Sequence, residues 1–65
     1  MISYTLNGKL RQGPACSVAE LVDSEVGTRT GVAVAIDGAV VPASQWSRTL
    51  AEGNAVDILT AVQGG

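Results

Sequence analysis

The sequence has no histidine, a single cysteine and only two aromatic residues, Tyr4 and Trp46, among its 65 residues. Histidine is the usual proton carrier near neutral pH, so its absence argues against acid–base catalysis by the chain itself. One cysteine cannot form an internal disulfide, which fits a reducing, cytoplasmic environment, and without histidine it supplies too few ligands for a structural zinc site. We therefore expect a carrier or substrate of other enzymes rather than an enzyme.

Charge and long apolar runs are also scarce. Four basic and six acidic residues give a net charge of −2, and the basic residues are scattered rather than clustered, at Lys9, Arg11, Arg29 and Arg48. Nucleic-acid binding needs a basic patch, which is missing. The sequence has no apolar run of about 18 residues, the length typical of a membrane-spanning helix, and its start does not resemble a signal peptide. We expect neither a nucleic-acid nor a membrane partner.

Aliphatic residues supply nearly all of the 46% of the sequence that is hydrophobic. A domain of this size buries only about 60% of the surface that its unfolded chain exposes, so most apolar residues are needed for one core. The sequence predicts a single domain over residues 1–65, with little apolar surface left for a deep active-site pocket.

Two dipeptides, Asn7-Gly8 and Asp37-Gly38, predict tight hairpin turns, because Asn, Asp and Gly tolerate the positive φ that such turns require. Apolar and polar residues alternate in "ISYTL", as in a half-buried strand. Proline cannot donate to a β-ladder, so the strand ending at Pro42 is expected at an edge of the sheet. The strands of these two hairpins are predicted over residues 2–6, 9–12, 32–36 and 39–42.

The segment "SVAELVDSEVG" predicts a helix. Ser17 and Glu20 have the spacing of a capping box, and Gly27 suits the left-handed residue that follows a helix. Apolar residues at helical spacing form one stripe that needs a sheet to cover it: Val18, Leu21, Val22 and Val26.

The stretch 43–50 is expected to be irregular or briefly helical around Ser44–Trp46, and "AVDILTAV" predicts a last strand over residues 55–62. This most apolar strand is expected at the centre of the sheet, parallel to the first strand. The order ββαββ predicts an α+β, β-grasp (ubiquitin-like) fold, a mixed sheet of about five strands with one main helix on one face.

Three stretches of the sequence resemble the ThiS family, the sulfur carrier proteins of thiamine (thiazole) biosynthesis: "NGK", "VAVAIDGAVVPASQW" and "EGNAVDILTAVQGG". The resemblance runs nearly the full length and is weakest over residues 12–31. Asn54 departs from it, because the family often has Asp there, and Cys16 is not a residue that the family requires.

This resemblance implies that a ubiquitin-activating-like adenylyltransferase adenylates the terminal carboxylate with ATP. A sulfur donor such as a cysteine desulfurase then supplies sulfur, AMP leaves, and thiazole synthase takes the sulfur from the resulting thiocarboxylate. Gly65 would carry the acyl-adenylate and the thiocarboxylate, and Gly64 would complete the motif. The chain would bind no cofactor itself, since ATP is used by the partner.

Residues 63–65 are expected to form a flexible tail. Glycine has no Cβ and allows close approach to a ligand, and Gln63 to Gly65 span at most roughly 10 Å when extended. In the last strand, Leu59 and Ala61 are expected to face outward as a partner-binding patch beside the tail. The same alternation places Ala55 and Asp57 outward. The other residues of the strand are expected to face the core: Val56, Ile58, Thr60 and Val62.

Three other functions share much of this pattern. A molybdopterin-type sulfur carrier has the same fold and ending, although the "VAVAIDGAVVPASQW" block and the short chain favour the thiazole carrier. A ubiquitin-like modifier joined to lysines would share the activation step. A plain interaction domain would have an inert tail, and in every case Cys16 is expected to be a small buried hydrophobe.

Overall fold

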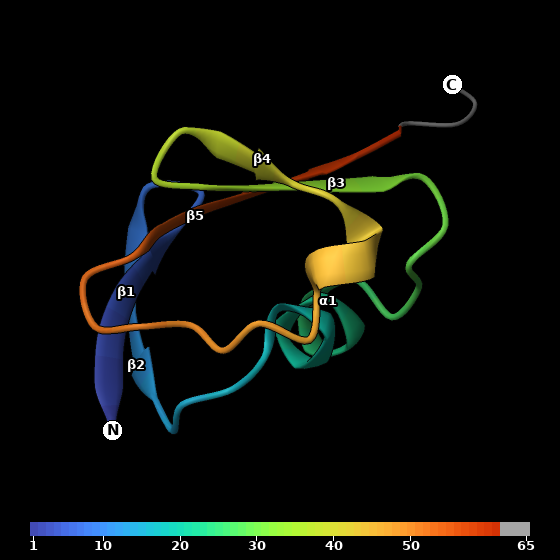
Figure 1. The fold of residues 1–65 in the computed structure, drawn as a ribbon. Coiled ribbons are helices and arrows are strands. Elements are labelled where there is room, and N and C mark those ends of the chain that lie inside the picture. Colours follow the sequence, from blue (N-terminus) through green and yellow to red (C-terminus); the bar gives the residue numbers. More distant parts are fainter. Residues whose placement is uncertain (62–65) are drawn as a thin grey trace.

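The computed structural model describes residues 1–61, and their path is drawn in Figure 1. Within them every predicted element is present, with three changes at the boundaries. The second strand extends to Gly13, the fourth ends before Pro42, and the last ends at Thr60 instead of residue 62, which lies outside the described residues. The elements are β1 (Ile2–Leu6), β2 (Lys9–Gly13), α1 (Val18–Glu25), β3 (Val32–Ile36), β4 (Ala39–Val41), the 3-10 helix η1 (Ala43–Gln45) and β5 (Ala55–Thr60).

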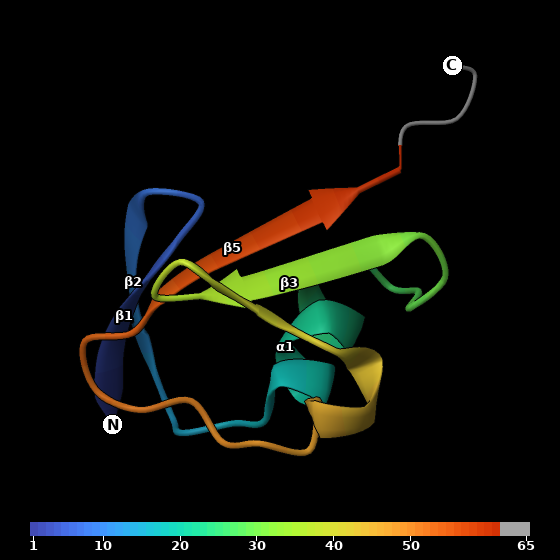
Figure 2. The same cartoon turned by 45° about the horizontal axis from the view of Figure 1, so that its top comes forward.

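The five strands in this part of the chain form one sheet in the order β2-β1-β5-β3-β4. As predicted, strand β5 lies at the centre and is parallel to β1, and β4 lies at an edge. Strand β5 is also antiparallel to β3. Helix α1 covers one face of the sheet (Figures 1 and 2). The arrangement is the predicted β-grasp, because two hairpins flank a central last strand and one helix covers them.

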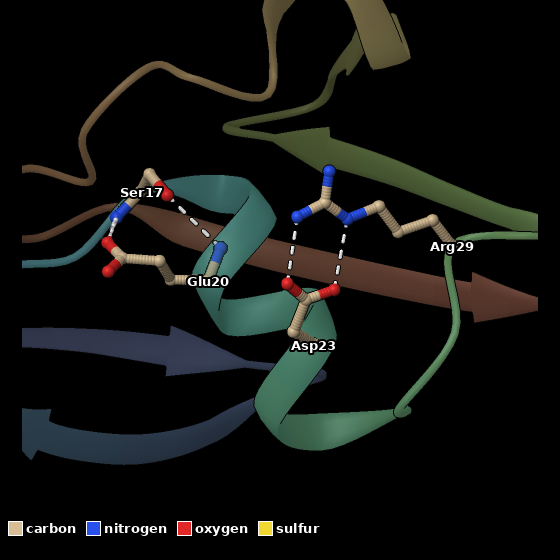
Figure 3. Close-up of polar contacts among 4 residues, drawn as sticks. All are labelled: Ser17, Glu20, Asp23 and Arg29. Carbon is tan, nitrogen blue, oxygen red and sulfur yellow. Dashed lines mark hydrogen bonds and ion pairs between the residues drawn. The ribbon is translucent and has the colours of Figure 1, made fainter.

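Helix α1 begins at the predicted capping box. The Glu20 amide donates to Ser17 Oγ at 3.1 Å, and Glu20 Oε1 accepts from the Ser17 amide at 2.8 Å (Figure 3). The helix ends before Gly27, whose φ of 86° is the left-handed conformation expected there. The first and last residues of its predicted apolar stripe differ in burial: Val18 is fully buried, whereas Val26 is only partly buried.

The core lies between α1 and the sheet and is closed at one side by Trp46. The Trp46 ring is buried, and its Nε1 donates to the Val41 carbonyl at 2.9 Å, so the polar end of the ring is also satisfied. The segment after β4 therefore acts as a cover for the core. The buried apolar residues are Tyr4, Leu6, Val18, Leu21, Val22, Val34, Ile36, Val41, Trp46, Leu50, Val56 and Ile58.

The parallel pairing of β5 with β1 is short, because it joins only Thr5 to Ala55 and Leu6 to Val56. The chain then turns away at Asn7, yet Asn7 continues the contact. Its amide donates to the Val56 carbonyl at 2.8 Å, and its side-chain Oδ1 accepts from the Ile58 amide at 2.9 Å. A side-chain oxygen thus replaces the backbone acceptor that a longer β1 would have provided.

The turn on the other side of β5 makes a similar contact. Asp37 Oδ1 accepts from the Ala55 amide at 2.8 Å, and the Asp37 amide donates to the Ala55 carbonyl at 2.8 Å. Asn54 donates from Nδ2 to Asp37 Oδ2 at 3.0 Å and accepts at Oδ1 from the Ala51 amide at 2.7 Å. An aspartate at position 54 would have no hydrogen to donate to Asp37, so this geometry explains the amide found there.

The Asn7 contact gives the first prediction. Asn7→Gly keeps the positive φ of 50° accessible but leaves the Ile58 amide without its acceptor, so the free energy of unfolding should fall by about 1–3 kcal/mol. Asn7→Asp is the matched control, because it keeps an oxygen at the same place and should lose much less. Urea unfolding followed by Trp46 fluorescence measures both, and equal stabilities for the two variants would contradict the proposed role of this contact.

Candidate functional site

The sheet face opposite α1, here called the outer face, is the surface to which the sequence assigned partner binding. Successive strand residues point to opposite sides, and the pairing registers align the residues that share a side. The outer face is largely apolar or small in character. It carries Ser3, Thr5, Leu10, Gln12, Ala33, Ala35, Val40, Ala55, Asp57 and Leu59.

Leu59 lies on this face beside Ala33 of β3, its partner in the register. Its predicted exposure is confirmed, since 69% of its surface is accessible, whereas its contact with a partner stays a prediction. Leu10, also 69% exposed, and Val40, 78% exposed, lie on the same face, on the edge strands β2 and β4. These three exposed aliphatic side chains lie on one face of the sheet, although on different strands.

Ala61 follows the end of β5 and is exposed, in agreement with its predicted outward position. Its amide donates to the Gly31 carbonyl at 2.7 Å, so the chain is still held to the loop before β3 at this point. The other predicted tail residues, Gln63, Gly64 and Gly65, lie outside the described residues.

The register places Thr60 on the helix side of the sheet, as predicted, but the expectation that it is part of the core is wrong, because Thr60 is exposed. Its register partner is Val32, the first residue of β3, which is itself only partly buried. Ile58 is the last buried residue of β5, so the core ends there and the strand continues past it. Val62, which was also expected in the core, lies outside the described residues.

Cys16 does not have the surroundings of a reactive thiol. Burial against the core raises its pKa above the usual range, and the nearby Glu20 carboxylate raises it further. Because the thiolate is the nucleophilic form, both effects disfavour reaction near neutral pH. This placement agrees with the expectation that Cys16 packs as a small hydrophobe.

The described part of the chain offers little to a small ligand. Residues 1–61 contain no group of three or more His, Cys, Asp or Glu side chains that could hold a metal ion. A hollow of about 120 Å³ is lined by Met1, Ile2, Ser3 and Gln12, but binding sites for small molecules are usually about 300 Å³ or more. None of the helices in these residues is long and apolar enough to cross a membrane.

Charged side chains pair mainly away from the outer face. Arg29 donates to both carboxylate oxygens of Asp23, at 3.0 and 2.8 Å, and these hydrogen bonds lower the pKa of Asp23 (Figure 3). Arg11 is paired with Glu25. Asp57, in contrast, has no hydrogen bond or ion pair from its carboxylate to any residue from 1 to 61. The alternating pattern had placed Asp57 outward without assigning it a role.

The sequence matches the model of the ThiS family over residues 4–65, which is nearly its whole length. The structure is similar to the crystal structure of the thiamine biosynthesis protein (ThiS) from Geobacter metallireducens, with a TM-score of 0.80 and 28% sequence identity. That similarity covers 98% of this chain and 100% of the other. No match is found among curated proteins. The family match and the shared β-grasp fold agree, and the chain belongs to the ThiS family.

Proposed function

We propose that this chain is a sulfur carrier of thiamine biosynthesis, and that Gly65 at the end of its sequence carries the sulfur as a thiocarboxylate. The observation that supports this most directly is the match to the ThiS family, which extends through Gly64-Gly65. The similarity to the Geobacter metallireducens protein over both whole chains adds support from the fold.

The proposed chemistry has two balanced steps. A carboxylate oxygen of Gly65 attacks the α-phosphate of ATP on an adenylyltransferase, pyrophosphate leaves, and an acyl-adenylate forms. Hydrosulfide, released by a thiol reductant from the persulfide of a donor such as a cysteine desulfurase, then attacks the acyl carbon and AMP leaves, which yields the thiocarboxylate. Thiazole synthase is the proposed acceptor of that sulfur.

In this proposal the chain positions the reacting carboxylate, and the partner enzyme catalyses the reaction. Strand β5 is paired on both edges and fixed at its start by Asn7 and Asp37, so the tail begins from a well-defined place. Gly64 and Gly65 have no side chains that would hinder entry of the carboxylate into a narrow active site. Docking of the folded body then offsets the entropy lost when the tail is ordered.

The outer face is the proposed docking surface, and Leu59 is its proposed contact nearest to the tail. Leu59 lies one residue before the end of β5 and is exposed over 69% of its surface. Because the chain has no histidine and Cys16 is partly buried with a raised pKa, we propose a co-substrate of cytoplasmic enzymes rather than a catalyst.

Reconstitution tests the proposed function. The purified protein is incubated with an adenylyltransferase of the ubiquitin-activating type, ATP and a sulfur source, and its intact mass is measured. We expect a gain of one oxygen-to-sulfur exchange located at Gly65, and the same gain in Cys16→Ser, which lacks the chain's only thiol. Lysine-linked adducts would indicate a protein modifier instead, and an unchanged mass would indicate an interaction domain with an inert tail.

A carrier of thiazole sulfur must also deliver it to the right acceptor. Incubation of the sulfur-loaded protein with thiazole synthase and its small-molecule substrates should return the mass to that of the carboxylate. Sulfur transfer to a molybdopterin precursor, with none to the thiazole substrates, would favour the molybdopterin-type carrier.

Deleting Gly65, or extending the chain beyond it with a tag, should abolish the mass gain, since the reacting carboxylate is removed or displaced. Thermal unfolding should be nearly unchanged, because the buried core residues found within residues 1–61 all lie at or before Ile58. A large loss of thermal stability on deletion would show that the last residue is structural and would contradict the proposed role of the tail.

Leu59→Asp should lower kcat/KM for adenylation by roughly tenfold or more, because burying a leucine side chain at an interface is worth about 1.5–3 kcal/mol. Leu10→Asp is the matched control: it has the same 69% exposure and lies on the same face, but two strands away on β2. Its effect should be clearly smaller. Unchanged adenylation of a folded Leu59→Asp protein would remove Leu59 from the docking surface.

A further inference from the structure

Asp57 is the only charged side chain among the outward-facing residues of the described strands. The basic residues of β2, Lys9 and Arg11, are aligned with Leu6 and Tyr4 and therefore lie on the helix side of the sheet. Among the outward-facing residues of these strands, one carboxylate thus has no other charged side chain beside it.

The position of Asp57 is central on that surface. Strand β5 is the middle strand, and the register places Asp57 beside Ala35, which is in turn beside Val40. Along the strand, Asp57 lies between Ala55 and Leu59 on the same side. Ala35 and Ala55 have short side chains and Asp57 is exposed, so its carboxylate is accessible to a partner.

The folded chain itself gives no reason for a carboxylate at this place. Aspartate is among the residues that strands disfavour, and no cation in residues 1–61 lies within 4 Å of Asp57. Arg11 and Arg29 are already paired with Glu25 and Asp23. The charge therefore adds nothing evident to the stability of the sheet.

A partner that covers the outer face must remove water from this carboxylate. Such a loss of hydration is costly unless a cation replaces the water, and a paired charge then fixes the register of the two proteins. Arginine is the side chain best suited to this place, because its planar guanidinium can bind a carboxylate with two hydrogen bonds and lie flat over apolar neighbours.

We propose that the adenylating partner presents a basic side chain, an arginine by this geometry, to Asp57 at the centre of the interface. This inference rests on the proposed function, and it adds the charge and the position of the contact that the partner must supply. Leu59 and Val40 then form the apolar surroundings that exclude water from the ion pair.

The test is the affinity of the adenylyltransferase for the full-length protein, measured by isothermal titration calorimetry. Asp57→Asn should weaken binding by roughly tenfold or more, because it leaves a buried cation unpaired, and Asp57→Lys should abolish it. Asp23→Asn is the matched control, since it makes the same change of net charge on α1, away from the outer face. Its affinity should stay close to that of the wild type.

A second measurement identifies the cation. Arginine and lysine residues of the partner are changed one at a time to glutamate, and each partner variant is tested for binding to Asp57→Lys. One of these exchanges of charge should restore binding. Failure of every exchange to restore binding would overturn the direct pairing. Circular dichroism checks that the Asp57 variants are folded. Asp57→Thr is a second neutral variant, with a residue type that is common in strands, and it should weaken binding as Asp57→Asn does.

Three outcomes separate this inference from the function on which it rests. If wild-type protein gains sulfur but Asp57→Asn binds the adenylyltransferase as tightly as wild type, the pairing of Asp57 with a partner cation is refuted and the carrier function stands. If Asp57→Asn self-associates in sedimentation experiments yet binds the partner normally, the carboxylate serves only to keep copies apart, which also refutes the proposal. A wild-type protein that binds but never gains sulfur refutes the carrier function alone.

Discussion

The pairing of β5 between β1 and β3 is the interaction on which the rest of the structure depends. In the described sheet the two hairpins, β1–β2 and β3–β4, share no ladder with each other and are joined only through β5. Loss of this strand would leave two separate hairpins and an uncovered helix, and an isolated hairpin is marginal in water. The segment that leads into the tail is therefore also the one that the whole sheet holds in place.

The two faces of β5 differ in burial. Val56 and Ile58 face α1 and are buried in the core, whereas Asp57 and Leu59 face outward and are exposed. The period of two along a strand makes this division possible within four residues. A partner that binds the outer face would contact the strand that precedes residues 62–65 in the sequence, so binding to this face would also fix the position of the last described residues.

Local signals in the sequence predicted most of the fold. Hairpin dipeptides, a capping box and alternating strands each depend on neighbours a few residues apart, and all of them are present in the structure. The turn residues Asn7 and Asp37 were predicted only as turns, whereas the structure shows that their side chains also hold β5. These contacts join residues 51 and 18 positions apart, a separation at which sequence spacing gives no signal.

The candidate site was predictable to a similar extent. Alternation placed Leu59 outward correctly, but it also assigned Thr60 to the core, because a period of two does not indicate where the helix stops covering the sheet. The same pattern placed Asp57 outward without showing that its carboxylate has no partner on the described surface, which depends on where every cation of the fold lies. The role of Gly64-Gly65 came from resemblance, since glycine at a chain end has no chemistry specific to it.

The proposal that Gly65 carries sulfur can be tested by the intact mass of the protein purified from its own cells under gentle conditions. We expect a population heavier by one oxygen-to-sulfur exchange, with fragmentation placing the sulfur at Gly65 and not at Cys16. A protein found only with an unmodified carboxylate, even in cells that are making thiazole actively, would contradict the proposal.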